Sequence, residues 1–470
     1  MSTISENDVQ WSNLSLVDDV GRVFHWNGGI FRGIYPQAAE RVRALFASGL
    51  LDELTSRGFF PRTQITSHTF DGFAFVVEHE AVPIVTYPHE WSFDMLRDAA
   101  RTVLEIGEIA ARFDWLLKDC HPYNVLFHGT RPLYVDLGSF VPATAGYAWS
   151  RGDAFLSLYW WPLSIWSSGD YFLAQRIISS AHESMPAMSW SYLIVRRLGR
   201  WFGPCIATLC QYAVRGIAYL CRKGGLLDRL AAPLLSRLPA DFLANNPEML
   251  RRKIVRLPSP ALASFWRDYH SEFMRNGVPT STPRFDRIVD IVQSLAPESV
   301  VDLAGNQGVV SMLLAARTPV RRIICTDYDA SAINRLYGYC RAQSVVPPGT
   351  MIQPAVINFM IPETNFYTIP PADRFRADVV MALAVTHHLT ISQNFSLRLV
   401  MRKIASYTCR FALVEFMPLG LWDGRHQTPP LPSWYGPAWF RQAFEEFFEV
   451  LSVEEVETNR VLYLGRLKGS

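Results

Sequence analysis

A buried-strand pattern that runs directly into a glycine turn is the feature that most restricts the fold of this chain. Residues 300–308 read VVDLAGNQG, so Asp302 lies near the end of an apolar run, and Gly305 and Gly308 follow it. In open α/β sheets, ligands bind beyond the carboxyl ends of the strands, where glycine lets a ligand approach the backbone and a helix N-terminus favours negative charge. The segment therefore predicts a nucleotide-like ligand site on an α/β sheet.

Strands and helices alternate along the sequence around this turn. Apolar runs predict strands at 299–303, 322–326, 351–358, 378–384 and 411–416, and a hairpin-like pair at 448–455 and 460–466. Amphipathic periodicity predicts helices at 284–295, 308–316, 331–342, 396–407 and 439–448. Strands interleaved with helices indicate a mainly parallel, doubly wound sheet, here with an antiparallel edge at its end. We therefore assign residues 259–470 to one Rossmann-like α/β domain.

Polar residues also end the next two predicted strands. Asp327 follows Asp302 by 25 residues and ends the second strand, the usual position for accepting hydrogen bonds from two ribose hydroxyls. Asn358 ends the third strand. The turn after the first strand lacks the G-x-G-x-x-G pattern of dinucleotide sites and has the spacing D-x-x-G-x-x-G instead. We therefore predict that Asp327 is a ribose ligand.

The D-x-x-G-x-x-G turn resembles the first motif of class I S-adenosylmethionine-dependent methyltransferases. Ala304 departs from that motif, because family members often have glycine at its position. The resemblance implies S-adenosyl-L-methionine as the cofactor, with Asp302 beside its methionine amino group. It also implies that the backbone from Gly305 to Gly308 wraps the methionine part and that Asn358 contacts the adenine.

A pair of histidines, His387 and His388, follows the fourth predicted strand. Its carboxyl end points to the same edge of the sheet as the glycine turn, so one histidine falls where the methyl group and its acceptor should meet. A neutral imidazole, with an ordinary pKa of about 6.5, can take a proton from a hydroxyl. Glu415, which closes the fifth strand, is predicted to orient that histidine. The pattern does not distinguish the two histidines.

The N-terminal part, residues 1–149, contains a second group of polar residues with a recognisable spacing. Its beginning predicts a β-hairpin over 21–34 and a helix over 39–54. Asp119 and Asn124 then reproduce the D-x-x-x-x-N spacing of a kinase catalytic loop, and Asp136 follows two short predicted strands as the metal-binding aspartate of kinases does. The segment thus resembles an α+β kinase domain.

Phosphoryl transfer also needs a cation on the α/β-phosphates. Lys118 is the first lysine of the chain, so no upstream strand supplies one, and Arg32 is a weak substitute because its planar fork coordinates differently. We therefore interpret residues 1–149 as a degenerate kinase-like domain that serves as a scaffold or binds a nucleotide or substrate. A purely structural polar turn stays open as an alternative.

Residues 150–258 form an aromatic-rich helical segment with several prolines, which either stands alone or completes the N-terminal domain. Its uncharged stretches of 16 and 14 residues are shorter than the roughly 18–20 needed to span a bilayer. An arginine-bearing amphipathic helix at 191–222 leaves peripheral membrane contact open. The first residues lack the basic and apolar regions of a secretion signal, which favours a cytoplasmic location.

Charge and cysteine content exclude other classes. The 45 basic and 43 acidic residues give a net charge of +2 without a basic stripe, so a nucleic-acid partner has no electrostatic support. The seven cysteines contain no C-x-x-C pair, so we predict neither a disulfide framework nor a metal site.

The segment 382–394 (ALAVTHHLTISQN), together with the N-terminal group of polar residues, resembles a bacterial family of two-part methyltransferase-like proteins that includes a rhizobial host-specific nodulation protein. The resemblance covers nearly the whole chain and is strongest at 114–140, 299–330 and 378–418. It implies a role in making or decorating nodulation signals, which are acylated chitin oligosaccharides.

The leading interpretation is a methyltransferase that acts on a hydroxyl or amine of a glycan or glycolipid intermediate. Two alternatives stay open. One is a sugar or lipid kinase with a fused accessory domain. The other is a non-enzymatic assembly protein, which the departures at Ala304 and Asn358 would suit.

Overall fold

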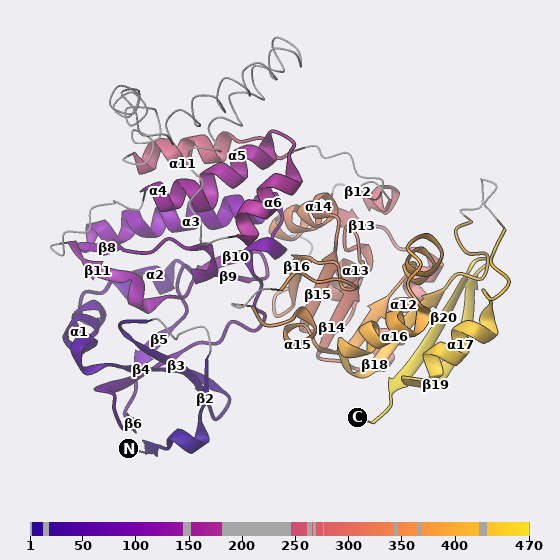
Figure 1. The fold of residues 1–470 in the computed structure, drawn as a ribbon, viewed down its shortest axis with the longest axis horizontal. Coiled ribbons are helices and arrows are strands. Elements are labelled where there is room, and N and C mark those ends of the chain that lie inside the picture. The colour runs from indigo at the N-terminus through magenta and orange to yellow at the C-terminus, as the bar shows by residue number, and fades with distance from the viewer. Residues whose placement is uncertain are drawn as a thin grey trace, which may run out of the picture. The chain divides into compact units, whose positions relative to one another are not determined.

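The computed structural model describes residues 2–12, 18–143, 152–180, 246–260, 266, 269–275, 277–342, 346–364, 368–422 and 430–469 (Figure 1). The described residues form two compact units. The first comprises those of Met1–Val82, Leu96–Leu126 and Pro132–Ala261, and the second those of Pro83–Met95, Phe127–Arg131 and Leu262–Ser470. Two short segments from the N-terminal half of the sequence therefore belong to the C-terminal unit.

A seven-stranded sheet forms the centre of the C-terminal unit, with the order β16-β15-β14-β17-β18-β20-β19. Its strands are β14 (Ser299–Leu303), β15 (Arg322–Asp327), β16 (Met351–Val356), β17 (Ala377–Ala382), β18 (Thr408–Phe416), β19 (Phe448–Glu457) and β20 (Arg460–Leu467). The strands from β14 to β18 pair in parallel, whereas β20 pairs antiparallel with both β18 and β19. The predicted parallel sheet with an antiparallel edge is confirmed.

The direction of the strand order reverses at β14, the central strand. From β14 the chain continues to β15 and β16 on one side of the sheet and then returns to β17 and β18 on the other. Such a switch point leaves a crevice outside the carboxyl ends of the two strands that flank it. Here those ends are Leu303 of β14 and Ala382 of β17, which pair directly.

Helices cover this sheet with their buried apolar residues. They are α12 (Pro283–Ser294), α13 (Val309–Arg317), α14 (Ala330–Arg341), α15 (Pro371–Arg374), α16 (Leu397–Ser406) and α17 (Pro437–Glu445). On α16, Val400, Met401 and Ile404 are fully buried and pack in one core cluster with Val301 and Val380 of the sheet. Because strand side chains alternate between faces, Asp302 lies on the opposite face from Val301.

The N-terminal unit contains a five-stranded sheet of the order β2-β3-β4-β7-β5. The strands are β2 (Gln10–Trp11), β3 (Gly21–Trp26), β4 (Gly29–Ile34), β5 (Thr63–Ile65) and β7 (Phe75–His79), and β1 (Thr3–Ile4) pairs with β6 (Thr69–Phe70). The predicted hairpin is confirmed, since β3 and β4 pair antiparallel around Asn27 and Gly28, both at positive φ. The single helix predicted over 39–54 is wrong: Gly49, at φ 78°, separates α1 (Ala39–Ala47) from α2 (Leu50–Ser56).

The remaining described elements of the N-terminal half are mostly helical. They are α3 (Phe93–Arg112), β8 (Trp115–Leu117), β9 (Val125–His128), β10 (Arg131–Tyr134), β11 (Phe140–Pro142), α4 (Gly152–Phe155), α5 (Trp161–Ser167), α6 (Tyr171–Ser179) and α11 (Pro247–Arg256). Within the described ranges, none of the helices is both long and apolar enough to cross a bilayer. The amphipathic helix predicted at 191–222 lies outside the described residues.

Candidate functional site

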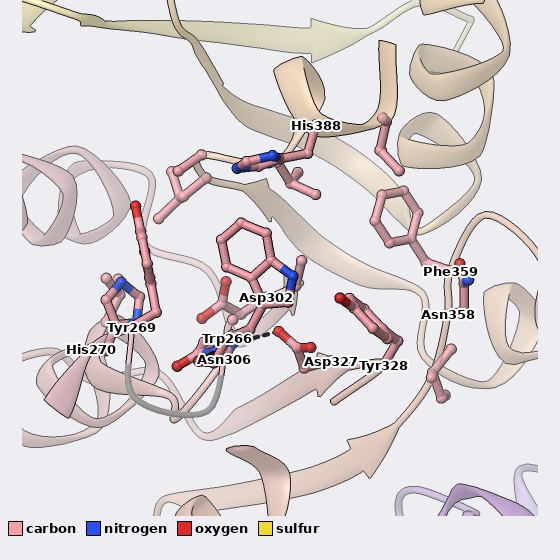
Figure 2. A pocket seen from close by; sticks show the side chains of 18 of the residues that line it. Trp266, Tyr269, His270, Asp302, Asn306, Asp327, Tyr328, Asn358, Phe359 and His388 are labelled. Carbon is pink, nitrogen blue, oxygen red and sulfur yellow. Dashed lines mark hydrogen bonds between the residues drawn. The ribbon is translucent and has the colours of Figure 1, made fainter. Parts of the chain in front are cut away.

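A cavity of about 310 Å³ opens at the carboxyl ends of the central strands of the C-terminal unit (Figure 2). Its walls come from the turn after β14, the residues at and after the ends of β15 and β16, the loop after β17, and residues that precede the sheet in sequence. The lining residues whose side chains have polar or ionisable groups are Trp266, Tyr269, His270, Arg284, Asp302, Asn306, Asp327, Tyr328, Asn358, His388 and Gln393. The cavity thus occupies the switch-point crevice, where ligands of α/β sheets bind.

The turn after β14 brings the backbone close to this cavity. A Cβ atom at Gly305 would lie 2.6 Å from Cys325 Sγ and 2.7 Å from Asp302 Oδ2, so any side chain there would displace the aspartate. Ala304 also lines the cavity and adopts φ 57°, a left-handed conformation that glycine reaches without strain. The structure therefore explains physically why glycine suits the position where this chain has alanine.

Gly308 has a packing role in the same turn. It adopts φ 70° at the start of α13, and an added Cβ would lie 2.6 Å from a methyl group of Leu336 on α14. It is not among the residues that line the cavity. Gly308 therefore lets two helices approach each other, while Gly305 shapes the cavity wall.

Two buried carboxyl groups face the cavity, as the sequence predicted for Asp302 and Asp327. Asp302 accepts a hydrogen bond from Ser311 Oγ at 2.7 Å, and burial raises its pKa to about 7. Asp327 accepts hydrogen bonds from the backbone N–H groups of Asn306 and Asp329, both at 2.9 Å, and burial raises its pKa to about 6. A cationic or hydroxyl-bearing ligand would stabilise the charged form of either group.

Aromatic side chains surround one end of the cavity beside Asn358. The Asn358 Oδ1 accepts hydrogen bonds from the N–H groups of Met360 and Ile361, which fixes the side chain in a local turn. Figure 2 shows Tyr328 and Phe359 on the same side of the cavity as Asn358. The sequence analysis missed both aromatic residues, although each directly follows a predicted site residue in the chain.

The structure separates the two predicted histidines. His388 lines the cavity, and its ring centroid lies 4.0 Å from that of His387 and 4.6 Å from that of Trp266. His387 is 4% exposed and is not among the cavity-lining residues. Burial lowers the pKa of His388 to about 4 and that of His387 to about 2. Both rings are therefore neutral near pH 7, and His388 is the one that a ligand can touch.

Glu415 does not have the partner that the sequence analysis expected. Its fully buried carboxylate accepts hydrogen bonds from Arg284 at 2.7 and 2.9 Å and from Arg460 at 2.9 Å. Its carboxylate thus anchors two arginines, and the expected role of orienting a histidine is corrected. Sequence spacing could not reveal this, because Arg284 lies 131 residues before Glu415.

Two further cavity residues near the arginines were also missed. Arg460 Nη2 donates to the Tyr269 hydroxyl at 3.4 Å. Burial, reinforced by Arg284 and Arg460, lowers the pKa of His270 to about 3. Tyr269 and His270 lie on the side of the cavity opposite Tyr328 and Asn358 in Figure 2.

The N-terminal unit brings together some of the predicted kinase-like residues. Asn124 Nδ2 donates to Asp119 Oδ2 at 3.0 Å. Asp136 is engaged by its own chain, because its Oδ1 accepts from Gly138 N–H and lies 3.3 Å from Arg32 Nη1, and its Oδ2 accepts from a serine hydroxyl. Arg32 also pairs with Asp18 at 2.8 Å. The kinase-like assignment stays a prediction.

The fold and the cavity define a Rossmann-like α/β unit with a cavity at its switch point. The chain is similar to nodulation protein NoeA of Rhizobium meliloti (strain 1021), with 25% identity over 422 residues that cover 86% of this chain and 84% of NoeA. No protein-family model matches the chain.

Solved methyltransferase structures are also similar to part of the chain. A magnesium protoporphyrin IX methyltransferase from Synechocystis with bound SAH is 16% identical, with a TM-score of 0.30 over 39% of this chain and 82% of that chain. An S-adenosylmethionine-dependent methyltransferase from Clostridium acetobutylicum is 12% identical, with a TM-score of 0.30 over 40% of this chain and 91% of that chain.

Proposed function

We propose that this protein is an S-adenosyl-L-methionine-dependent methyltransferase whose C-terminal unit holds the cofactor. The observation that carries the proposal is the position of Asp327, a buried carboxylate at the end of β15 that lines the switch-point cavity. The D-x-x-G-x-x-G turn at Asp302, with its resemblance to the first motif of class I methyltransferases, supports the same cofactor.

The cavity residues fit the polar groups of this cofactor. Asp302 would accept from the cationic methionine amino group, and Asp327 would accept from the ribose hydroxyls. Asn306 supports the fit, because its buried side-chain Oδ1 has no hydrogen-bond partner within the described residues. A buried acceptor without a partner costs free energy, which a donor on the ligand would recover. Tyr328 and Phe359 would flank the adenine beside Asn358.

The bound cofactor would supply an electrophilic methyl group. The protein would orient the acceptor and receive its proton, and His388 is the residue suited to the second task. Its ring is neutral near pH 7, so one ring nitrogen has a free lone pair that can accept the proton of an acceptor hydroxyl. The pKa of about 4 makes it a weak base, so its position in the cavity has to supply the catalytic advantage. His387, behind it, would position the ring. We therefore propose His388, rather than His387, as the base.

We further propose a glycan or glycolipid intermediate as the acceptor and the cytoplasm as the location. The similarity to NoeA, a nodulation protein, supports the acceptor class. In this proposal, residues 259–470 are the methyltransferase domain, residues 1–149 are a degenerate kinase-like scaffold, and residues 150–258 form a helical segment that completes it. The alternative of a sugar or lipid kinase is weaker, because Arg32 and Ser139 already occupy the carboxylate of Asp136.

Calorimetric titration tests the proposal most directly. We expect the full chain to bind S-adenosylmethionine and its demethylated product. The acceptor is tested by comparing the masses of glycolipids from cells with and without the protein, where a difference of one CH₂ unit reports methyl transfer. If the chain binds neither S-adenosylmethionine nor ATP, that result would favour the assembly-protein alternative.

A further inference from the structure

A second hollow lies beside the cavity, on the other side of one short turn. This groove of about 460 Å³ is formed by the residues around Asn394 and the start of α16, and by α17 with the residues before it. The π-helical turn His388–Ser392 separates the two hollows: His388 and Leu389 line the cavity, whereas Thr390 lines the groove. In the same way, Gln393 lines the cavity and its neighbour Asn394 lines the groove.

Two tryptophans, whose ring planes are tilted by 53° to each other, line the groove, and we call them its aromatic platform. The ring centroids of Trp434 and Trp439 lie 4.9 Å apart, and Trp434 is 48% exposed. The buried ring of Tyr435 packs against this platform, with its centroid 5.2 Å from that of Trp439. The Tyr435 hydroxyl donates a hydrogen bond to the Met417 carbonyl oxygen at 2.9 Å, which fixes the tyrosine. The structure thus holds a large apolar ring in place at a solvent-exposed position, where it gains little from burial.

Polar groups border the same platform. The side-chain amides of Asn394 and Gln442 line the groove, and neither has a hydrogen-bond partner among the described residues. Arg398 Nε pairs with Glu446 Oε2 at 2.5 Å, joining α16 to the residue after α17. The groove therefore offers an aromatic face together with amide donors and acceptors and one neutralised ion pair.

This combination matches the chemistry of a pyranose ring. One face of such a ring presents C–H groups that stack on indole, while its edge carries hydroxyls that both donate and accept hydrogen bonds. A purely apolar ligand would cover the amides of Asn394 and Gln442 without satisfying them, which costs free energy. An anionic ligand gains little from Arg398, because Glu446 neutralises its charge at the same rim.

We propose that the groove is a saccharide-binding subsite, in which Trp434 stacks on a sugar ring and Gln442 and Asn394 bind its hydroxyls. Because only the turn His388–Ser392 separates the groove from the cavity, a sugar bound in the groove would lie near the cavity in which we propose methyl transfer. The link to methyl transfer rests on the proposed function, whereas saccharide binding by the groove does not.

The test is a titration of the full chain with unmodified tetrasaccharides of glucose, mannose and N-acetylglucosamine, read by tryptophan fluorescence and calorimetry. We expect at least one to bind, and Trp434→Ala to weaken that binding about tenfold through loss of the stacked ring. Gln442→Ala should weaken it about threefold. The control Leu451→Ala removes an apolar side chain of similar exposure on β19 and should bind as the wild type does.

Two results would overturn the proposal: no tetrasaccharide binds, or Trp434→Ala binds as tightly as the wild type. Binding to phosphatidylcholine and phosphatidylglycerol vesicles in place of saccharides would also overturn it and assign the groove to a lipid surface. A parallel titration with S-adenosylmethionine keeps the two proposals separate. If saccharide binds and the cofactor does not, the subsite stands and the proposed methyl transfer fails.

Discussion

Arg284 of α12 and Glu415 of β18 form a bidentate ion pair, with Nε 2.7 Å from Oε1 and Nη2 2.9 Å from Oε2. The Arg284 side chain is 7% exposed, and that of Glu415 is completely buried. Because Arg460 also binds this carboxylate, three charged groups share one buried site beside the cavity and carry one net positive charge. The pair fastens the first helix of the C-terminal unit to its sheet.

Glu415→Gln should therefore destabilise the fold. Removing the carboxylate leaves Arg284 buried without an anion, which typically costs about 3–5 kcal/mol of unfolding free energy, whereas Arg460 keeps its pair with Glu457 at 3.0 Å. Urea denaturation measures the change. The matched control is Glu454→Gln, which breaks the exposed pair of Arg287 on the same helix and should cost at most about 1 kcal/mol. Unchanged stability with a lost rate would instead place Glu415 in the chemistry.

His388→Gln should lower the methyl-transfer rate by about 10²–10⁴-fold and leave cofactor affinity intact, since a positioned base contributes a factor of that size. His387→Gln should keep the rate within about tenfold. Single-turnover kinetics and calorimetry measure rate and affinity separately. Equal losses in both variants would contradict the assignment of His388 as the base.

The pH dependence of the rate gives an independent test of His388. An ordinary histidine loses its basic form below pH about 6.5, but burial holds the pKa of His388 at about 4. The neutral form persists above that value, so the contribution of His388 to the rate should be constant from about pH 6 to 8 and fall only toward pH 4. A fall in rate that is centred near pH 6.5 and absent from His388→Gln would contradict the lowered pKa.

Asp327→Ala should raise the dissociation constant of S-adenosylmethionine by more than about 100-fold. Two charge-assisted hydrogen bonds, worth roughly 1.5–3 kcal/mol each, are lost. Asp327→Asn keeps one acceptor oxygen for the local turn and should show an intermediate loss. Asp290→Ala, an exposed carboxylate on α12, serves as the control and should bind normally. Unchanged affinity in Asp327→Ala would remove this residue from the cofactor site.

The N-terminal unit should not hydrolyse ATP or transfer phosphate. Asp119 and Asn124 contact each other, but the carboxylate of Asp136 is occupied by Arg32 and Ser139. A coupled phosphate-release assay on the full chain with Mg²⁺ should give only background turnover. Robust turnover that disappears in Asp136→Ala would show an active kinase and overturn the scaffold assignment.

The sequence was sufficient to predict the sheet of the C-terminal unit, because its central strands are apolar runs and helices such as α12 and α16 have one apolar face. It also located Asp302, Asp327 and His388 at one edge, since parallel strands bring their carboxyl ends together. It did not reveal that Arg284 pairs with Glu415, because an ion pair between residues 131 positions apart gives no recognisable sequence motif. The break at Gly49 was missed because the apolar periodicity continues across it.

Residues that pack far from their sequence neighbours were equally invisible. Glu90 lies in the N-terminal half of the sequence, yet its buried carboxylate pairs with Arg374 of α15 in the C-terminal unit. Trp91 is completely buried there, and its ring centroid lies 5.1 Å from that of Phe127. Local patterns assign such residues to the elements beside them in sequence, which explains why a boundary drawn at residue 259 left them with the N-terminal part.

The segment Pro83–Met95 has a consequence for how the protein is made. A ribosome adds roughly 5–20 residues per second, so Trp91 and Glu90 emerge on the order of ten seconds or more before Arg374 of α15, the partner of Glu90. During that interval an indole ring and a carboxylate destined for full burial are exposed to water. The Glu90 carboxylate therefore stays without Arg374 until synthesis has passed α15, although its segment lies between two stretches of the N-terminal unit in the sequence.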